Sequence, residues 1–198
     1  VYLILSTLQN TAKKNAILEE SQIYFIDENN EFYNALDSNL YLIGFNNGVY
    51  DLVKNEFRKA QPSDYITLST GYDFPKENAL IQEEIIKFFK SIFENEVDFQ
   101  YYIDILSYCL SGNRYREKFN ILTGCGANGK GLSFTLIENA FGDYIRKVSN
   151  TQFTGKSLKP NQHNNELANT RGRRIIFTTE PDANEKLRCD RIKEWTGG

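Results

Sequence analysis

The sequence predicts an α/β fold with two domains. A mainly helical domain with a β-hairpin is expected over residues 1–112, and a core of strand, loop and helix over residues 113–198. A short β-prone run over residues 118–123 predicts a strand that leads into a glycine-rich loop and then into apolar residues at helical spacing. Farther upstream, two short β-prone runs flank Asn46-Asn-Gly48, whose residues tolerate positive φ and so favour a tight hairpin turn.

The first domain is expected to begin with a helix and to continue with short strands. Apolar residues recur at near-helical spacing over residues 1–20. Short runs rich in aromatic and β-branched residues follow, separated by polar turn residues. The extended segments expected here are residues 23–26, 40–45, 49–53, 56–59 and 64–68.

Two packed helices are expected before the loop, and a strand and a helix after it. Residues 81–92 and 99–110 each carry one apolar stripe, and Gly112 is placed to end the second helix. Downstream, residues 173–179 predict a strand and residues 184–195 a short helix. The aromatic residues of the two helices before the loop are expected in the core, because they recur at helical spacing.

The run from Gly124 to Lys130 fits the phosphate-loop pattern G-x-x-x-x-G-K. Its glycines allow successive backbone N–H groups and the start of the following helix to face one anion. Lys130 adds a positive charge for the β- and γ-phosphates. The nucleotide-binding residues expected on this basis are Gly124, Cys125, Gly126, Ala127, Asn128, Gly129, Lys130, Gly131 and Leu132.

One position departs from the phosphate-loop pattern. Gly131 stands where a Ser or Thr would offer a hydroxyl to Mg²⁺, and the nearest hydroxyl along the chain belongs to Ser133. Since the bare pattern arises by chance in roughly one chain in twenty of this length, a glycine-rich turn that binds nothing is the alternative. The strand and helix expected on either side favour the phosphate loop.

An acidic residue follows the next apolar strand. The run that starts at Ile175 leads to Glu180, where a carboxylate could hold Mg²⁺ through water and polarise an attacking water. A carboxylate that merely ends a strand at the surface is the alternative, and Asp182 is a second acidic candidate. Lys130 and Glu180 are therefore the predicted catalytic residues, ATP and Mg²⁺ the expected cofactors, and Glu180 and Ser133 the candidate metal ligands.

Composition limits the class of protein and the kinds of partner that the chain can have. With 40% hydrophobic and 14% aromatic residues, the chain of 198 residues is expected to be globular. Its net charge of -3 supplies no overall basic field, so any DNA contact must be local or come from a pore shared between subunits. The sequence shows no zinc-site spacing. It also has no apolar run of about 18 residues, so a soluble intracellular protein without a membrane partner is expected. Because it lacks methionine and stops without a closing element, the chain is expected to be a fragment.

These motifs resemble those of a known family. In the order GCGANGK, LANTRGRRIIFTTEPD and RIKEWTGG, they are similar to the superfamily 3 helicases. The resemblance is strongest to the helicase-primases of poxviruses and other nucleocytoplasmic large DNA viruses, with related phage and plasmid primase-helicases. The run LIGFNNGVYDL, over residues 42–52, is similar to the domain that precedes the ATPase core in that family. The resemblance extends from about residue 35 to the last residue.

The resemblance implies a partial, AAA+-like P-loop ATPase core, truncated before its sensor strand and arginine finger. Gly124 to Lys130 would be Walker A, Glu180 the Walker B carboxylate, and Lys193 a DNA-contacting candidate at the start of a later motif. The family forms hexameric rings that pull single-stranded DNA through a central pore. The resemblance further implies other replication proteins as partners and a viral replication compartment, cytoplasmic or nuclear, as the location.

Two other classes remain open. A P-loop kinase of small molecules would leave the long amino-terminal half without a role, and a non-catalytic assembly module would account for Gly131. Nucleotide binding would separate the assembly module from the enzymes, and stimulation by single-stranded DNA would separate a helicase from a kinase.

Overall fold

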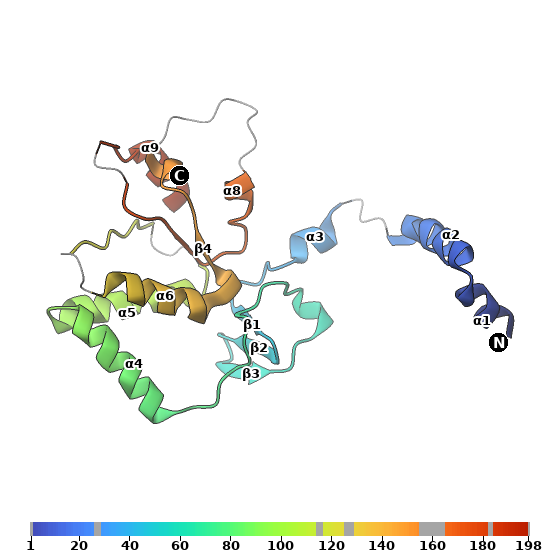
Figure 1. Cartoon of the computed structure of the whole chain (residues 1–198), viewed down its shortest axis with the longest axis horizontal. Coiled ribbons are helices and arrows are strands. Elements are labelled where there is room, and N and C mark those ends of the chain that lie inside the picture. Colours follow the sequence, from blue (N-terminus) through green and yellow to red (C-terminus); the bar gives the residue numbers. More distant parts are fainter. Residues whose placement is uncertain are drawn as a thin grey trace. The chain divides into compact units, whose positions relative to one another are not determined.

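The structure, a computed structural model, describes residues 2–25, 29–113, 117–124, 129–154, 165–181 and 184–197. The chain divides into two compact units, Val1–Leu36 and Asp37–Gly198. The larger unit holds both sheets and the helices of the predicted core (Figure 1).

The first unit is helical, as predicted for its first residues. It contains α1 (Tyr2–Gln9), α2 (Thr11–Gln22), a 3-10 helix (Ile23–Phe25) and α3 (Glu31–Ala35). Asn10 separates the first two helices and caps the second, since its side chain accepts from the Lys13 amide at 3.1 Å. The extended segment predicted at residues 23–26 is wrong for Ile23–Phe25, because the backbone of Ile23 continues the helical turn and its N–H bonds to the Ser21 carbonyl.

A three-stranded antiparallel sheet begins the second unit and confirms the predicted hairpin. Its strands are β1 (Leu42–Phe45), β2 (Gly48–Asp51) and β3 (Glu56–Arg58), in that order. Phe45 pairs with Gly48, which leaves Asn46 and Asn47 as the turn. A Cβ on Gly48 would lie 2.4 Å from the Arg58 carbonyl oxygen, so only glycine fits this close approach.

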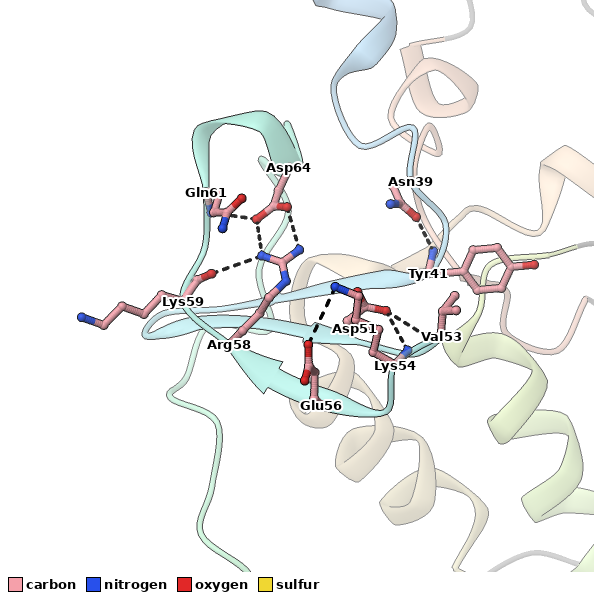
Figure 2. A network of polar contacts seen from close by, with 10 residues as sticks. All are labelled: Asn39, Tyr41, Asp51, Val53, Lys54, Glu56, Arg58, Lys59, Gln61 and Asp64. Carbon is pink, nitrogen blue, oxygen red and sulfur yellow. Dashed lines mark hydrogen bonds and ion pairs between the residues drawn. The ribbon is translucent and has the colours of Figure 1, made fainter.

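Polar contacts fix the ends of two strands of this sheet (Figure 2). Arg58 donates two hydrogen bonds to Asp64, at 2.8 and 2.7 Å, and the hydrogen bonds lower the pKa of that carboxyl below its usual value. Asp64 also accepts the Gln61 amide at 2.7 Å. At the other end, Asp51 accepts the amides of Val53 and Lys54 and so closes the turn between β2 and β3.

Residues 64–68, predicted as a short strand or an extended piece, form no strand. A 3-10 helix (Pro62–Asp64) precedes Tyr65, whose φ of 49° is left-handed. The Asp37 carboxylate then accepts the amides of Thr67 and Leu68 at 2.8 and 3.1 Å. Because a side chain takes up these donors, they are not free for a strand ladder.

The two predicted helices before the loop are confirmed. They are α4 (Ala79–Ile92) and α5 (Glu96–Leu110), and Gly112, with φ 59°, follows the second. With α6 (Lys130–Phe141), they contribute residues of the main core. Its buried residues are Phe89, Phe99, Tyr102, Ile137 and Ile145.

A parallel pair of strands completes the second unit. The strands are β4 (Ile145–Lys147) and β5 (Ile175–Phe177), so the strand predicted at residues 173–179 is confirmed in a shorter form. Three short helices accompany the pair: α7 (Thr151–Thr154), α8 (Asn165–Ala168) and α9 (Cys189–Thr196). The last begins later than predicted, because the backbone of Arg188 is extended and its amide donates to the Phe153 carbonyl at 2.8 Å.

The strand predicted over residues 118–123 is not formed, although the structure describes residues 117–124. A strand requires a neighbour for its backbone, and this segment takes part in no ladder. Leu122 packs against the main core while Ile121 stays exposed. The alternating residues of this segment are therefore compatible with a segment that forms no strand.

The mixed α/β class is confirmed, and the division at residue 112 stays a prediction.

Candidate functional site

The start of α6 has the backbone that the glycine pattern requires. Gly129 precedes the helix with φ 82°, a left-handed conformation that favours glycine. A Cβ there would lie 3.1 Å from the Ile92 side chain, so space is also short. Cys125, Gly126, Ala127 and Asn128 lie outside the described residues.

Lys130 is the first residue of α6, and its side chain turns back toward the loop. Its Nζ donates to the Gly124 carbonyl oxygen at 2.8 Å. A neutral carbonyl leaves the positive charge of the ammonium uncompensated at this contact. The lysine therefore stands where an anion at the start of the helix would meet it.

The next three residues of α6 have different surroundings. Gly131 and Leu132 are exposed, and a Cβ on Gly131 would meet no atom within 4 Å. Ser133 is 2% exposed, and its hydroxyl donates to the Lys130 carbonyl at 2.7 Å. A hydroxyl in this position gives no support to the magnesium role expected of Ser133, which stays a prediction.

Glu180 is exposed and follows the end of β5. The ring of Phe134, on α6, stacks on the ring of Phe177, the last residue of β5, with centroids 5.0 Å apart. This contact joins the helix that starts with Lys130 to the strand that leads to Glu180. The two predicted catalytic residues consequently line the same cleft, of about 1840 Å³.

The cleft is wide and mixed in charge. Its cations come from several elements, as do its acids, and Gly124 and Gly131 also line it. Such a cleft offers a ligand both the ammonium of Lys130 and the carboxylate of Glu180. Within the described parts of the chain, no three His, Cys, Asp or Glu side chains gather as a metal site. The charged lining residues are Lys118, Lys130, Glu138, Lys147, Arg171, Arg173, Arg174, Glu180, Glu185 and Glu194.

Lys193, the predicted DNA contact, is an exposed residue of α9. Its neighbours Arg191 and Glu194 form an ion pair at 3.5 Å. The position leaves the lysine accessible, and its role in DNA binding stays a prediction. Asp182, the second acidic candidate, lies outside the described residues.

Sequence reasoning missed the role of Arg174. The structure places its guanidinium among backbone carbonyls, with Leu40 at 2.6 Å and Leu42 at 2.7 Å. It also lies over the ring of Tyr144, 5.0 Å from the centroid. No local sequence pattern could predict these contacts, because the Leu40 and Leu42 carbonyls are more than 100 residues away from Arg174 along the chain.

None of the described helices combines the length and the apolar character that a bilayer crossing requires.

The part of the chain that the structure describes is thus a mixed α/β protein with a cleft that is lined, among other elements, by α6 and the end of β5. Residues 4–94 match the family model described as D5 N terminal like. The match begins well before residue 35, where the motifs first suggested the family, and ends before the glycine-rich loop.

Relatives in large DNA viruses cover most of the chain. A protein of Acanthamoeba polyphaga mimivirus named "Putative helicase" is 34% identical over 197 residues, 98% of this chain and 20% of that protein. Proteins with the same name in Invertebrate iridescent virus 3 and Invertebrate iridescent virus 6 are 32% and 36% identical, over 85% and 82% of this chain and 18% and 17% of their own lengths. The predicted resemblance is therefore confirmed: the chain is related to the D5-type helicase-primases of large DNA viruses. It spans about a fifth of the length of these relatives.

Proposed function

We propose that this chain is a segment of a viral DNA helicase that hydrolyses ATP to move along single-stranded DNA during genome replication. The observation that carries the proposal is the shared cleft of Lys130 and Glu180. Their elements are held together by the stacked rings of Phe134 and Phe177. The names of the viral relatives support the helicase assignment.

Each residue has a distinct role in this proposal. The amides at the start of α6 and the ammonium of Lys130 bind the β- and γ-phosphates, and the lysine neutralises charge that develops in the transition state. Glu180 orients and polarises the water that attacks the γ-phosphate in line. Lys130 contacts a neutral carbonyl and Glu180 is exposed, so both charges are accessible to the nucleotide and to water.

Mg²⁺ fits this site only as an ion held largely by water and phosphate. Magnesium commonly keeps several waters and takes one or two carboxylates. Glu180 supplies an exposed carboxylate, whereas Gly131 supplies no hydroxyl and the Ser133 hydroxyl is engaged in a hydrogen bond. When bound, the ion would neutralise phosphate charge, and the protein would contact it chiefly through Glu180.

The remaining assignments of this proposal come from the family. They are a hexameric ring that binds single-stranded DNA in its pore, with Lys193 near that DNA, association with other replication proteins, and action in the viral replication compartment. An acidic chain with a net charge of -3 fits a ring, in which local cations repeat around an axis, better than an isolated DNA-binding domain.

The test is ATP hydrolysis by the full-length viral protein, with and without single-stranded DNA. Lys130→Ala should lower turnover at least about 100-fold and leave thermal stability unchanged, because the side chain acts on phosphate. Lys87→Ala is the matched control, since that lysine is exposed on α4 and forms an ion pair with the exposed Glu83. Wild-type turnover by Lys130→Ala would refute the site. Absence of ATP hydrolysis by the wild-type protein would favour a non-catalytic assembly module instead.

A further inference from the structure

Arg174 stands directly before β5 and ties that strand to two distant elements. Its guanidinium donates to the carbonyls of Leu40, at 2.6 Å, and of Leu42, at 2.7 Å, at the start of β1. It also donates to the carbonyl of Leu110, the last residue of α5. One side chain therefore connects three elements that are far apart in the sequence.

Tyr144 adds a second tie at the same junction. It stands directly before β4, and its hydroxyl donates to the Leu68 carbonyl at 3.0 Å and accepts the Gly44 amide at 2.7 Å. The Arg174 amide donates to the Tyr144 carbonyl at 2.7 Å, and the guanidinium lies over the tyrosine ring. The starts of both parallel strands are thus fastened to the antiparallel sheet.

The chemistry of this junction is specific to arginine. A guanidinium offers donors in a fixed planar fork, so it can reach several carbonyls at once, whereas a lysine ammonium is a single point charge. Burial lowers the pKa of Arg174 from its ordinary value, but an arginine stays protonated in proteins. The guanidinium donates its hydrogen bonds to the neutral carbonyls of Leu40, Leu42 and Leu110, so the group serves to fix the backbone.

The far end of α6 is held by the same part of the chain. Tyr72 donates its hydroxyl to the Ala140 carbonyl at 2.7 Å. Asp143 and Ser69 exchange two hydrogen bonds, one from the Asp143 amide to the Ser69 carbonyl and one from the Ser69 amide to the Asp143 carboxylate. The helix that begins with Lys130 is therefore anchored at its other end by residues 69–72.

We propose that Arg174 is a positioning residue for ATP hydrolysis: by fastening β5 to β1 and α5, it sets where Glu180 stands relative to Lys130. This inference rests on the proposed function of the cleft. A two-stranded sheet is at best marginally stable alone, so external ties must fix where β5 ends. Because Arg174 and Glu180 flank the same short strand, a shift at its start is transmitted to its end.

The first test compares variants of the full-length protein by ATP binding and by turnover per bound ATP. In Arg174→Lys, the stoichiometry and affinity of ATP binding should stay within about twofold, because the phosphate loop is untouched. Turnover per bound ATP should fall on the order of tenfold, since small misplacement of a reacting group is costly. Arg146→Lys, an exposed substitution on β4, is the matched control and should change neither quantity.

A purely structural role gives a different result. Turnover would then fall only in proportion to the number of ATP sites, and turnover per bound ATP would match the wild-type value, which would overturn the proposal. Tyr144→Phe provides a milder second variant, because it removes the hydroxyl and keeps the ring beneath Arg174. It should lower turnover per bound ATP in the same direction and by less.

Amide hydrogen exchange tests the fastening without relying on hydrolysis. Arg174→Lys should speed exchange in β5 and also in β1, and Tyr144→Phe should speed exchange at Gly44, whose amide loses its acceptor. Faster exchange confined to the mutated segment would overturn the fastening. Absence of hydrolysis in the wild-type protein would overturn the proposed function and the catalytic part of this inference, while the exchange pattern would still decide the fastening.

Discussion

The rings of Phe134 and Phe177 are stacked, with centroids 5.0 Å apart and an interplanar angle of 23°. This contact is a direct side-chain link between α6, which begins with Lys130, and β5, which leads to Glu180. The geometry of the candidate site therefore depends on an apolar contact that takes no part in the chemistry.

Replacing Phe134 by alanine should destabilise the protein by about 2 kcal/mol. The value lies below the 3–5 kcal/mol typical of buried phenylalanines, because Phe134 is only half-buried. Urea unfolding of the 198-residue chain would measure the loss, with Phe25→Ala as the control at an 83% exposed position. Equal stability of both variants would show that the stacked pair contributes little.

Glu180→Gln should separate ATP binding from ATP cleavage. The amide keeps the shape of the side chain and loses the charge that polarises water, so the full-length variant should bind ATP normally. Its turnover should fall by about 10²–10⁴-fold, the range of general-base catalysis. Binding and single-turnover assays with the same protein would check both quantities. Loss of ATP binding together with turnover would argue against a role confined to cleavage.

Gly131→Ser should tighten Mg²⁺-dependent nucleotide binding or leave it unchanged. An added Cβ at this position meets no atom within 4 Å, and serine is a better helix former than glycine. Titration with ATP at several Mg²⁺ concentrations would measure the effect. A steep loss of affinity would mean that the backbone or the nucleotide needs glycine here.

Gly142→Ser, at the other end of the same helix, is the matched contrast. Gly142 has φ 53°, and its Cβ would lie 2.3 Å from the Thr70 carbonyl oxygen. The same substitution should therefore lower the free energy of unfolding at Gly142 and not at Gly131. Similar stability of the two variants would contradict the close packing of α6 against Thr70.

The elements that could be predicted are those with a local cause. Asn46 and Asn47 form the hairpin turn, apolar stripes define α4 and α5, and Gly112 follows the second helix, each from chemistry within a few residues. The incorrect strands have distant causes. Asp37 takes the amides of the segment after Tyr65, and residues 117–124 have no ladder partner in the described structure.

The candidate site follows the same division. The left-handed Gly129 and the first helical residue, Lys130, could be anticipated from the glycine pattern. The stacked Phe134 and the fastening by Arg174 could not, because each depends on which segments meet after folding. A sequence pattern reports residue types and spacing, whereas those contacts depend on tertiary structure.

Acid should abolish the contribution of Asp64 to stability. The hydrogen bonds from Arg58 lower the pKa of Asp64 in the folded protein, so its contribution is present above the unfolded pKa of about 3.9 and is lost as the pH falls through the folded pKa. At pH 7, Asp64→Asn should cost about 1–2 kcal/mol. Denaturant unfolding at pH 7 and near pH 2.5 should show this difference shrinking toward zero. A difference that is constant with pH would mean that the carboxylate charge contributes nothing.

The 198-residue chain should bind single-stranded DNA weakly, with a dissociation constant no tighter than the range of about 10⁻⁴–10⁻⁶ M typical of non-specific contacts. Its net charge is -3, and several of its cations are already engaged: Arg58 with Asp64, Arg174 with backbone carbonyls and Arg191 with Glu194. The full-length mimivirus relative, measured alongside, should bind more tightly if a ring repeats its pore cations around one axis. Titrations at two salt concentrations would compare the slopes, since each phosphate contact adds to the salt dependence. Tight, salt-sensitive binding by the 198 residues alone would place a DNA site within this chain and contradict the need for assembly.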